Sequence, residues 1–392
     1  MRCLRPLLLI CSTVFFTACG GGGGGGGGHS VTVTPAPSGA NVQAISVNGG
    51  PGGNVNLPLV SVQVCETSSS ARCVTINNIL VDTGSSGLRV LSSALSSVSL
   101  TAQTVGNNPL LECVKFVDDS HAWGAIKIAD VKIGGKTASS IRIQAIGNPQ
   151  GIVEPSVCGV ATDNLDTLDK LGANGILGVG QFTEDCGSTC ANVTNNKQYF
   201  SCTGSSCVST SALTIAQVQN PVAAFDSDNN GVIIQLPSIA ATGAANIDGW
   251  LIFGIGTQSN NTLGSEKIFT LDNSGYISTT YKGDSYPHSF LDSGSNGFYF
   301  PDSSIPKCMT ATDFYCPTST LNLSATIIGE NNASTTVNFS VANAESFAST
   351  VAAVPTLAGP YDDGFDWGLP FFIGRKVYTA FENNSSGTYV AF

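Results

Sequence analysis

The sequence predicts an all-β protein, and three observations carry this prediction. Charged residues make up only 11% of the 392 residues, and glycine occurs 45 times. Such a composition favours strands and turns over helices with salt-bridged faces. Most apolar residues stand in short, alternating runs, which is the periodicity of a strand. The length allows two domains of ordinary size or one large β unit.

Residues 1–19 have the form of a bacterial signal peptide. Arg2 and Arg5 precede an apolar run, and two small residues precede Cys19. This ending resembles a lipobox and predicts that Cys19 carries a lipid; cleavage at an ordinary Ala-x-Ala site is the alternative. Residues 20–45 include nine consecutive glycines and predict a flexible tether to the cell envelope. In a Gram-negative host, the membrane would be the outer one.

The charge and the histidine content exclude several classes of function. A net charge of −11 disfavours nucleic acid and acidic lipid headgroups as partners. A histidine-based metal site or a Ser/His/Asp triad would have to use His29, His121 and His288, and His29 lies in the tether. We expect no cofactor and no bound metal, and we expect the protein to be a monomer.

Two structural units are expected after the tether, at residues 46–220 and 221–392. In the first, a polar turn at residues 118–121 joins the strands at 110–117 and 122–133 into a long hairpin whose tip is a candidate flap. The strands of the first unit are predicted at residues 57–65, 73–81, 110–117, 122–133 and 175–180, and a helix is predicted at residues 163–171. The strands of the second unit are predicted at residues 222–225, 232–236, 250–254, 377–381 and 388–392.

The turn at residues 226–231 resembles the start of a calcium-binding loop. An EF-hand needs Glu at its twelfth position, where this chain has Pro237. We therefore expect an ordinary hairpin turn.

Ten cysteines follow the tether, and an even number in an exported chain predicts disulfides. We expect the pairs Cys65–Cys73, Cys308–Cys316 and Cys113–Cys158. We also expect disulfides among Cys186, Cys190, Cys202 and Cys207. A zinc site is the alternative for these four residues.

One four-residue motif occurs twice. Asp82-Thr83-Gly84-Ser85 and Asp292-Ser293-Gly294-Ser295 each follow apolar residues, and each precedes a later apolar segment with glycine, at residues 176–178 and 367–368. Glycine permits a tight turn in which backbone and hydroxyl donors reach the carboxylate. Two facing carboxylates cannot both ionise, so they share one proton and supply an acid and a base. The alternative is a pair of structural turns capped by aspartate.

These motifs resemble those of the pepsin-like aspartic proteases. The likeness includes residues 175–178, 251–254 and 378–382, and it covers most of residues 55–392. It implies an all-β fold of two pseudo-twofold lobes with a central cleft and a few short helices. The chain also resembles a family of uncharacterised bacterial lipoproteins known only as a domain of unknown function, which implies no activity.

The resemblance to pepsin-like proteases implies a role for each residue of the two motifs. Asp82 and Asp292 would be the catalytic pair that activates a water molecule. Thr83 and Ser293 would form hydrogen bonds across to the opposite lobe. Ser85 and Ser295 would hold the outer carboxylate oxygens. Gly84 and Gly294 would permit the turn.

The flap departs from the pepsin pattern at two positions. Val117, beside Phe116, stands where the family has Tyr, and Arg89 stands where it has Trp. Trp123 is a candidate for the missing aromatic ring, and Arg89 is expected to pair with an acidic residue of the flap turn. The alternative is a core position for Trp123 and a solvated one for Arg89.

The sequence thus predicts a membrane-tethered aspartic endopeptidase that acts on peptides or unfolded proteins. An inactive pepsin-like lipoprotein that serves as a binding or inhibitor-like module is the alternative. A purely structural lipoprotein is the third possibility.

Overall fold

Strand β1 (Val42–Asn48) begins inside the segment that we predicted to be a tether. The computed structural model describes residues 37–67, 72–149 and 151–392, so the signal peptide, Cys19 and most of the tether lie outside the described residues. Strand β1 pairs along its length with β14 (Ile247–Phe253). Residues 42–45 therefore belong to the sheet.

The protein is β-rich with barrel-like sheets, as the composition predicts. After β1, the first half of the described chain contains β2 (Leu57–Cys65), β3 (Cys73–Asp82), β4 (Ser86–Leu91), β5 (Thr101–Ala102), β6 (Thr104–Val105), β7 (Asn108–Lys115), β8 (His121–Ile133), β9 (Lys136–Ile146), β10 (Gly175–Val179), β11 (Tyr199–Thr203) and β12 (Ser206–Ser209).

The second half begins with β13 (Gly231–Gln235) and β14. It continues with β15 (Ile268–Thr270), β16 (Ile277–Tyr281), β17 (Asp284–Leu291), β18 (Phe298–Tyr299), β19 (Leu321–Ile328), β20 (Ser334–Val341), β21 (Ala358–Gly359), β22 (Asp366–Trp367), β23 (Lys376–Ala380) and β24 (Tyr389–Ala391).

Helices are short throughout the described residues. They are α1 (Leu168–Leu171), α2 (Gly187–Asn192), α3 (Leu369–Phe372) and the 3₁₀ helices Ser92–Leu95, Ala161–Asp163, Thr214–Ala216 and Ala344–Ser346. Among the residues that the structure describes, no helix is long and apolar enough to cross a membrane.

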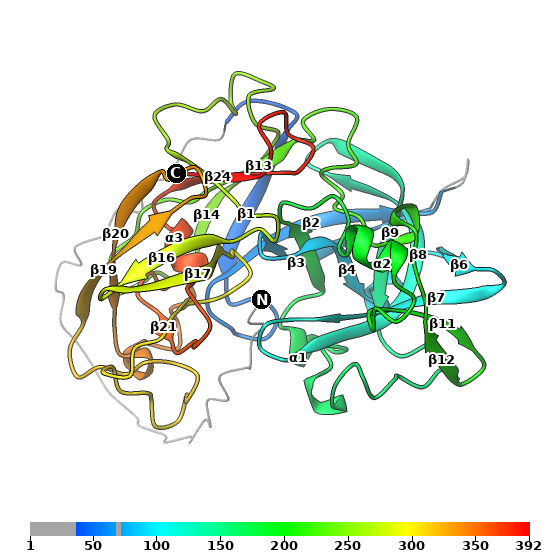
Figure 1. Ribbon diagram of the computed structural model, residues 1–392, viewed down its shortest axis with the longest axis horizontal. Coiled ribbons are helices and arrows are strands. Elements are labelled where there is room, and N and C mark those ends of the chain that lie inside the picture. Colours follow the sequence, from blue (N-terminus) through cyan, green and yellow to red (C-terminus); the bar gives the residue numbers. More distant parts are fainter. Residues whose placement is uncertain (1–36, 68–71, 150) are drawn as a thin grey trace, which may run out of the picture.

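Two sheets contain all the strands of the described residues. Strands β16 to β22 form a seven-stranded sheet in the order β20-β19-β16-β17-β22-β18-β21, and the remaining strands form a seventeen-stranded one. The pairing of β1 with both β2 and β14 makes the larger sheet continuous between the two halves of the chain. In Figure 1, the seven-stranded sheet and strands β2 to β12 lie on opposite sides, with β1 and β14 between them.

Strand β2 illustrates why the alternating runs form strands. Val60, Val62 and Val64 are buried in the core, whereas Ser61 and Gln63 between them remain partly exposed. Alternate side chains of a strand point to opposite faces, so this pattern buries one face only. The predictions for residues 57–65 and 73–81 are confirmed.

Asn56 joins the two halves of the chain. Its side chain is fully buried, donates to the carbonyls of Asn296 and Val354 at 2.7 and 2.8 Å, and accepts from the Val354 amide at 2.7 Å. The residue has a left-handed backbone with φ of 59°, a conformation that Asn tolerates better than most residues. The Asn56 side chain thus holds the start of β2 against the loop that follows Asp292 by one hydrogen bond and against Val354 by two.

Replacing Asn56 with Ala is expected to destabilise the fold by about 2–3 kcal/mol, because it leaves buried carbonyls without donors. Urea denaturation monitored by tryptophan fluorescence measures this change. Asn332→Ala is the matched control, since Asn332 is exposed and has the same φ of 59°. Equal losses in the two variants would trace the effect to the backbone conformation and contradict the role of the side chain.

The predicted helix at residues 163–171 is mostly wrong. Only α1 is α-helical, and Gly172 ends it in a left-handed conformation with φ of 72°. The amide of Leu165 donates to the carbonyl of His121 at 2.8 Å, and Asn164 pairs with His121 in a strand-like bridge. These tertiary bonds hold residues 164–165 extended and override the local helical pattern.

The predicted strand at residues 222–225 is also wrong, because residues 222–224 form a turn and Phe225 makes only an isolated bridge with Ala138. Phe225 is buried against Phe253, and β13 pairs instead with β14 and β23. In the following turn, the Asp228 carboxylate forms an ion pair with Lys136. This carboxylate is therefore occupied by protein groups, and the structure gives the calcium-loop alternative no support.

The ten cysteines that follow the tether all form disulfides. The three predicted pairs are confirmed, and the zinc alternative is wrong, because the other four cysteines form two further disulfides, Cys186–Cys190 and Cys202–Cys207. Five disulfides indicate that the chain folds in an oxidising environment outside the cytoplasm.

Candidate active site

The two Asp motifs lie at the ends of equivalent strands. Asp82 ends β3, which runs parallel to β10, and β10 pairs antiparallel with β4, the strand that follows the motif. Asp292 directly follows β17, which runs parallel to β22, and β22 pairs antiparallel with β18. The internal repeat seen in the sequence is therefore also a repeat of strand pairing.

Each carboxylate is held by its own loop. The Gly84 amide donates to Oδ1 of Asp82, and the Gly294 amide donates to Oδ1 of Asp292, both at 2.8 Å. The second oxygen of each carboxylate, Oδ2, accepts from the hydroxyl of the motif's last serine, which is Ser85 or Ser295. Both Asp residues are fully buried. Backbone and side-chain donors therefore determine the orientation of each carboxylate.

The hydroxyl residues after the aspartates connect the two loops. Thr83 Oγ1 donates to the Leu291 carbonyl at 3.0 Å, and Ser293 Oγ donates to the Val81 carbonyl at 2.8 Å. The same two hydroxyl oxygens accept reciprocally, from the Ser293 amide at 2.9 Å and from the Thr83 amide at 3.1 Å. Four buried hydrogen bonds thus fix one loop against the other.

Glycine is required where the loops approach each other. A methyl group on Gly84 would lie 2.6 Å from Cγ of Asp292, and one on Gly294 would lie 2.7 Å from Oδ1 of Asp82. These distances are too short for non-bonded atoms, so no larger residue fits. The approach brings the Asp82 and Asp292 carboxyl groups within hydrogen-bonding reach of each other.

Burial, together with the charge and the hydrogen bond of Asp292, raises the pKa of Asp82 well above its usual value, although the Ser85 hydroxyl opposes this shift. Two carboxyl groups at this separation bind one proton between them over a wide pH range. The arrangement can therefore supply a proton donor and a proton acceptor within one site.

Replacing Asp82 with Asn is expected to remove a pH dependence of stability. Because the folded pKa of Asp82 is raised, the folded state binds more protons than the unfolded state between the ordinary and the raised pKa. Stability therefore falls as the pH rises from about 4, the ordinary pKa of Asp, through the raised value. Urea denaturation between about pH 4 and 7 should show wild type losing stability relative to Asp82→Asn. Parallel curves for the two proteins would contradict the assignment.

A cavity of about 520 Å³ lies beside the Asp82 loop. Its walls include residues 83–86 of this loop, residues 113–117 of the β7–β8 hairpin and residues 274–277 from the second half of the chain. The cavity is therefore built between the two halves, beside the loop that carries Asp82, although neither Asp82 nor Asp292 is among the residues that line it. The hairpin that we predicted to be a flap forms one of its walls.

The three candidate flap residues have different positions. Val117 is 43% exposed and lines the cavity, and Phe116 also lines it, although most of its side chain packs into the core beside Leu57. Trp123 is fully buried, packs edge-on against Phe200 with ring centroids 5.6 Å apart, and is not among the cavity-lining residues. The prediction that Trp123 supplies the missing ring is wrong, because its position in β8 points it into the core.

The prediction that Arg89 pairs with Asp118 or Asp119 is wrong as well. Arg89 is buried, and its Nη2 bonds Oε1 of Glu112 at 3.0 Å and Oδ2 of Asp185 at 2.8 Å. Its Nη1 donates to the Ser86 carbonyl at 2.8 Å. Through these contacts Arg89 connects the strand after the Asp82 loop with the first strand of the flap hairpin.

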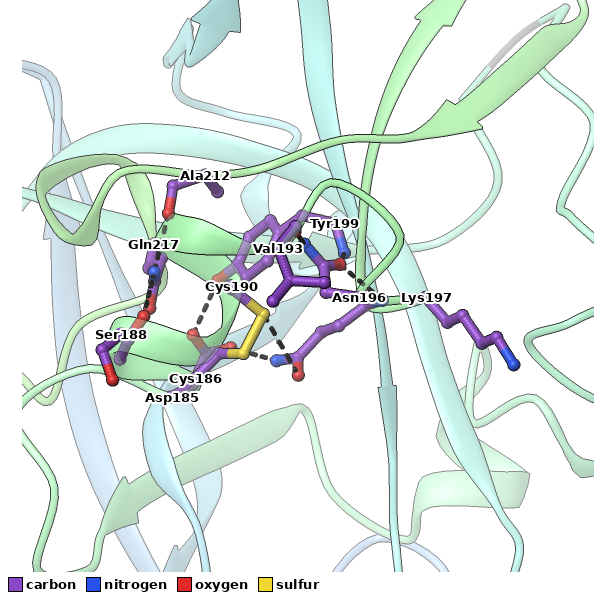
Figure 2. The surroundings of a disulfide bond; sticks show 12 residues. Asp185, Cys186, Ser188, Cys190, Val193, Asn196, Lys197, Tyr199, Ala212 and Gln217 are labelled. Atoms are coloured by element: carbon purple, nitrogen blue, oxygen red, sulfur yellow. Dashed lines mark hydrogen bonds between the residues drawn. A yellow bond between two sulfur atoms is a disulfide. The ribbon is translucent and has the colours of Figure 1, made fainter.

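Gln198 and Tyr199 complete this buried network. The Gln198 amide donates to Glu112 at 3.1 Å and to Asp185 at 3.0 Å, and the Tyr199 hydroxyl donates to Asp185 at 2.7 Å. Figure 2 shows Asp185 directly beside the Cys186–Cys190 disulfide at the start of α2. The disulfide thus limits the movement of the chain that carries Asp185.

The electrostatics of the network follow from two carboxylates that share one guanidinium. Burial alone would lower the pKa of Arg89, but the carboxylates of Glu112 and Asp185 outweigh it and raise this pKa. Burial and the neighbouring Glu112 raise the pKa of Asp185 well above its usual value despite Arg89. Burial and Asp185 also raise the pKa of Tyr199, which therefore remains a neutral donor.

The roles of Glu112, Asp185 and Gln198 were not predicted from the sequence. One signal was present, since Arg89 and Glu112 each stand alone within an apolar run, and buried charges occur almost only in pairs. That rule predicts a partner for each residue without naming it, so the pairing itself required the tertiary structure.

Metal-binding side chains cluster at one place in the described part of the chain, at Cys308, Cys316 and Glu345. Both cysteines are consumed by their mutual disulfide. A disulfide sulfur is no thiolate and does not serve as a metal ligand. This cluster therefore supports no metal site.

The fold and the site together define a β-rich, disulfide-bonded protein in which two Asp loops pair their carboxyl groups at one buried site. The chain belongs to the family described as "Protein of unknown function (DUF3443)", whose model matches residues 37–392. No curated protein matches the sequence.

Proposed function

We propose that this protein is an aspartic endopeptidase with the two-lobed, pepsin-like fold. One observation carries the proposal: two buried carboxyl groups lie within hydrogen-bonding reach, each in an Asp-hydroxyl-Gly-hydroxyl loop and each at the end of an equivalent strand. A structural turn does not require two such loops to face each other. The cross-bonds of Thr83 and Ser293 support the same interpretation, because they hold the pair in register.

The proposed reaction is hydrolysis of a peptide bond by an attacking water molecule. The two carboxyl groups would share one proton, so that one is ionised and the other protonated when the substrate binds. The ionised group then takes a proton from the water as it attacks the peptide carbonyl carbon, and the protonated group donates its proton to the carbonyl oxygen. The resulting diol collapses, the C–N bond breaks, and the leaving nitrogen receives a proton. The pair ends the cycle with one proton, as it began.

The cavity and the flap hairpin support a peptide as the substrate. An extended peptide that crosses the site would lie beside the Asp82 loop, with side chains in the cavity of about 520 Å³. Peptides that bind in this way use main-chain hydrogen bonds for affinity and pockets for selectivity. Unfolded proteins present such segments, whereas compact domains do not.

We further propose that the protein acts at the cell envelope as a lipoprotein anchored through Cys19. The disulfides support an extracytoplasmic location. Metabolic labelling with a radioactive fatty acid tests the anchor, because label should enter wild type and be absent from Cys19→Ala.

Incubation of the purified chain with a denatured, reduced protein between about pH 3 and 7, the range in which a shared-proton pair titrates, tests the proposed reaction. We expect new peptide termini, identified by mass spectrometry, with a maximum on the acidic side of neutrality. A folded protein that produces no cleavage at any pH in this range refutes the proposal.

The altered flap favours one second candidate, a binding module that has kept the site and lost turnover. The flap hairpin has Val117 where the pepsin-like family has Tyr, and Arg89 belongs to a buried ion network. This candidate predicts peptide binding without cleavage, and it predicts that Asp82→Asn binds as well as wild type does.

A further inference from the structure

The cavity beside the Asp82 loop has a basic lining in an acidic protein. The charged residues among its described lining are Arg89, Lys115, Lys197 and Asp185, whereas the whole chain has a net charge of −11. If the proposed function holds, this cavity receives a substrate side chain next to the cleaved bond. Its charge then decides which side chains bind there.

The carboxylate of Asp185 already has three donors. It accepts from Arg89 at 2.8 Å, from Gln198 at 3.0 Å and from the Tyr199 hydroxyl at 2.7 Å. A cationic side chain that entered the cavity would have to compete with these donors. The single acidic group of the lining therefore offers little to a basic substrate.

The charge of Arg89 is also taken up by protein groups. Its Nη2 bonds Glu112 and Asp185, its Nη1 donates to the Ser86 carbonyl, and its side chain is only 1% exposed. A substrate side chain in the cavity would therefore meet the lysines of the lining rather than the guanidinium.

Two lysines add positive charge to the lining. Lys115 ends β7 at the entry to the flap turn, and Lys197 precedes β11. Both side chains are exposed, and neither forms an ion pair with any residue that the structure describes. Figure 2 shows the Lys197 side chain extending away from Asp185 and its disulfide. Both ammonium groups are therefore available to a ligand.

We propose that this cavity is a subsite for an acidic side chain, Asp or Glu, of the peptide substrate. The carboxylate of the bound side chain would lie between the ammonium groups of Lys115 and Lys197. Charge-assisted bonds of this kind are stronger than neutral ones. The inference rests on the proposed function for the identity of the substrate, but peptide binding tests it independently of cleavage.

The experiment measures binding of short fluorescent peptides to the full-length Asp292→Asn chain, so that the peptide is not consumed. Glu is placed at each central position in turn, with Gln and Lys in matched peptides. We expect one position at which the Glu peptide binds about tenfold tighter than the Lys peptide, the sum of two modest ion pairs. Adding Lys115→Glu and Lys197→Glu should abolish this preference or reverse it.

Lys132→Glu together with Lys307→Glu is the matched control, because both lysines are exposed and neither lines the cavity. This control should keep the preference. Equal affinity for Glu, Gln and Lys at every position, or loss of the preference in the control, overturns the acidic subsite. Cleavage by wild type without the preference refutes the subsite and leaves the proposed function standing. The preference without cleavage supports the subsite and refutes the proposed function.

Discussion

Asp82→Asn and Asp292→Asn should each reduce peptide hydrolysis by about 10⁴-fold or more, the scale seen when a member of a catalytic unit is removed. An amide can neither take a proton from water nor donate one as a carboxylic acid does, so each variant lacks half of the acid–base pair. Initial rates with a fluorogenic peptide at the pH optimum measure the loss. A double variant should be no slower than either single one, because the two residues act together.

The fold of these variants should persist. The amide oxygen of Asn can still accept the bonds from the Gly84 or Gly294 amide that hold each carboxylate. Asp248→Asn is the matched control, since Asp248 is an exposed aspartate of β14, and it should retain full activity. Activity that survives in either dyad variant would exclude the paired carboxyl groups as the catalytic unit.

Arg89→Met is expected to destabilise the protein by about 3–5 kcal/mol, which is the cost of removing one partner from a buried ion pair. Met fills a similar volume but leaves Glu112 and Asp185 facing each other without a cation. Urea denaturation at neutral pH measures the loss. At acidic pH the loss should shrink, because the two carboxyl groups then bind protons and cease to repel each other.

Two controls separate charge from packing. Arg72→Met removes a cation that is 66% exposed and should change stability little. Adding Glu112→Gln and Asp185→Asn to Arg89→Met removes the uncompensated charges and should recover a large part of the lost stability. A triple variant as unstable as Arg89→Met alone would show that shape, rather than charge, makes Arg89 important.

The features that the sequence predicted well are local ones. Strand β2 and its partner β3 follow from alternating side chains, and the pair Cys65–Cys73 follows from their short separation. The two Asp motifs were found for the same reason, since each is a strand end and a tight turn within a few residues. Their pairing required one further step, the repeat, which implied that like elements would face each other.

The features that it missed depend on contacts between distant residues. The sequence around Arg89 does not indicate that its partner is Asp185, which lies 96 positions later. The sequence around Asn164 likewise does not indicate that bonds to His121 and Glu154 keep this residue out of a helix. The core position of Trp123 likewise depends on Phe200, a residue of β11. In each case a tertiary contact outweighed the local pattern.

The sequence by itself determined the β class, the short-range disulfides and the identity of the two acidic loops, because composition, alternation and turn chemistry act over a few residues. Only the tertiary structure decided that Asp82 and Asp292 lie within reach of each other and that Arg89 connects the flap hairpin to the Asp82 loop. The physical reason is that hydrogen bonds and ion pairs depend on distance in space, and the folded chain brings together groups that are hundreds of residues apart in sequence.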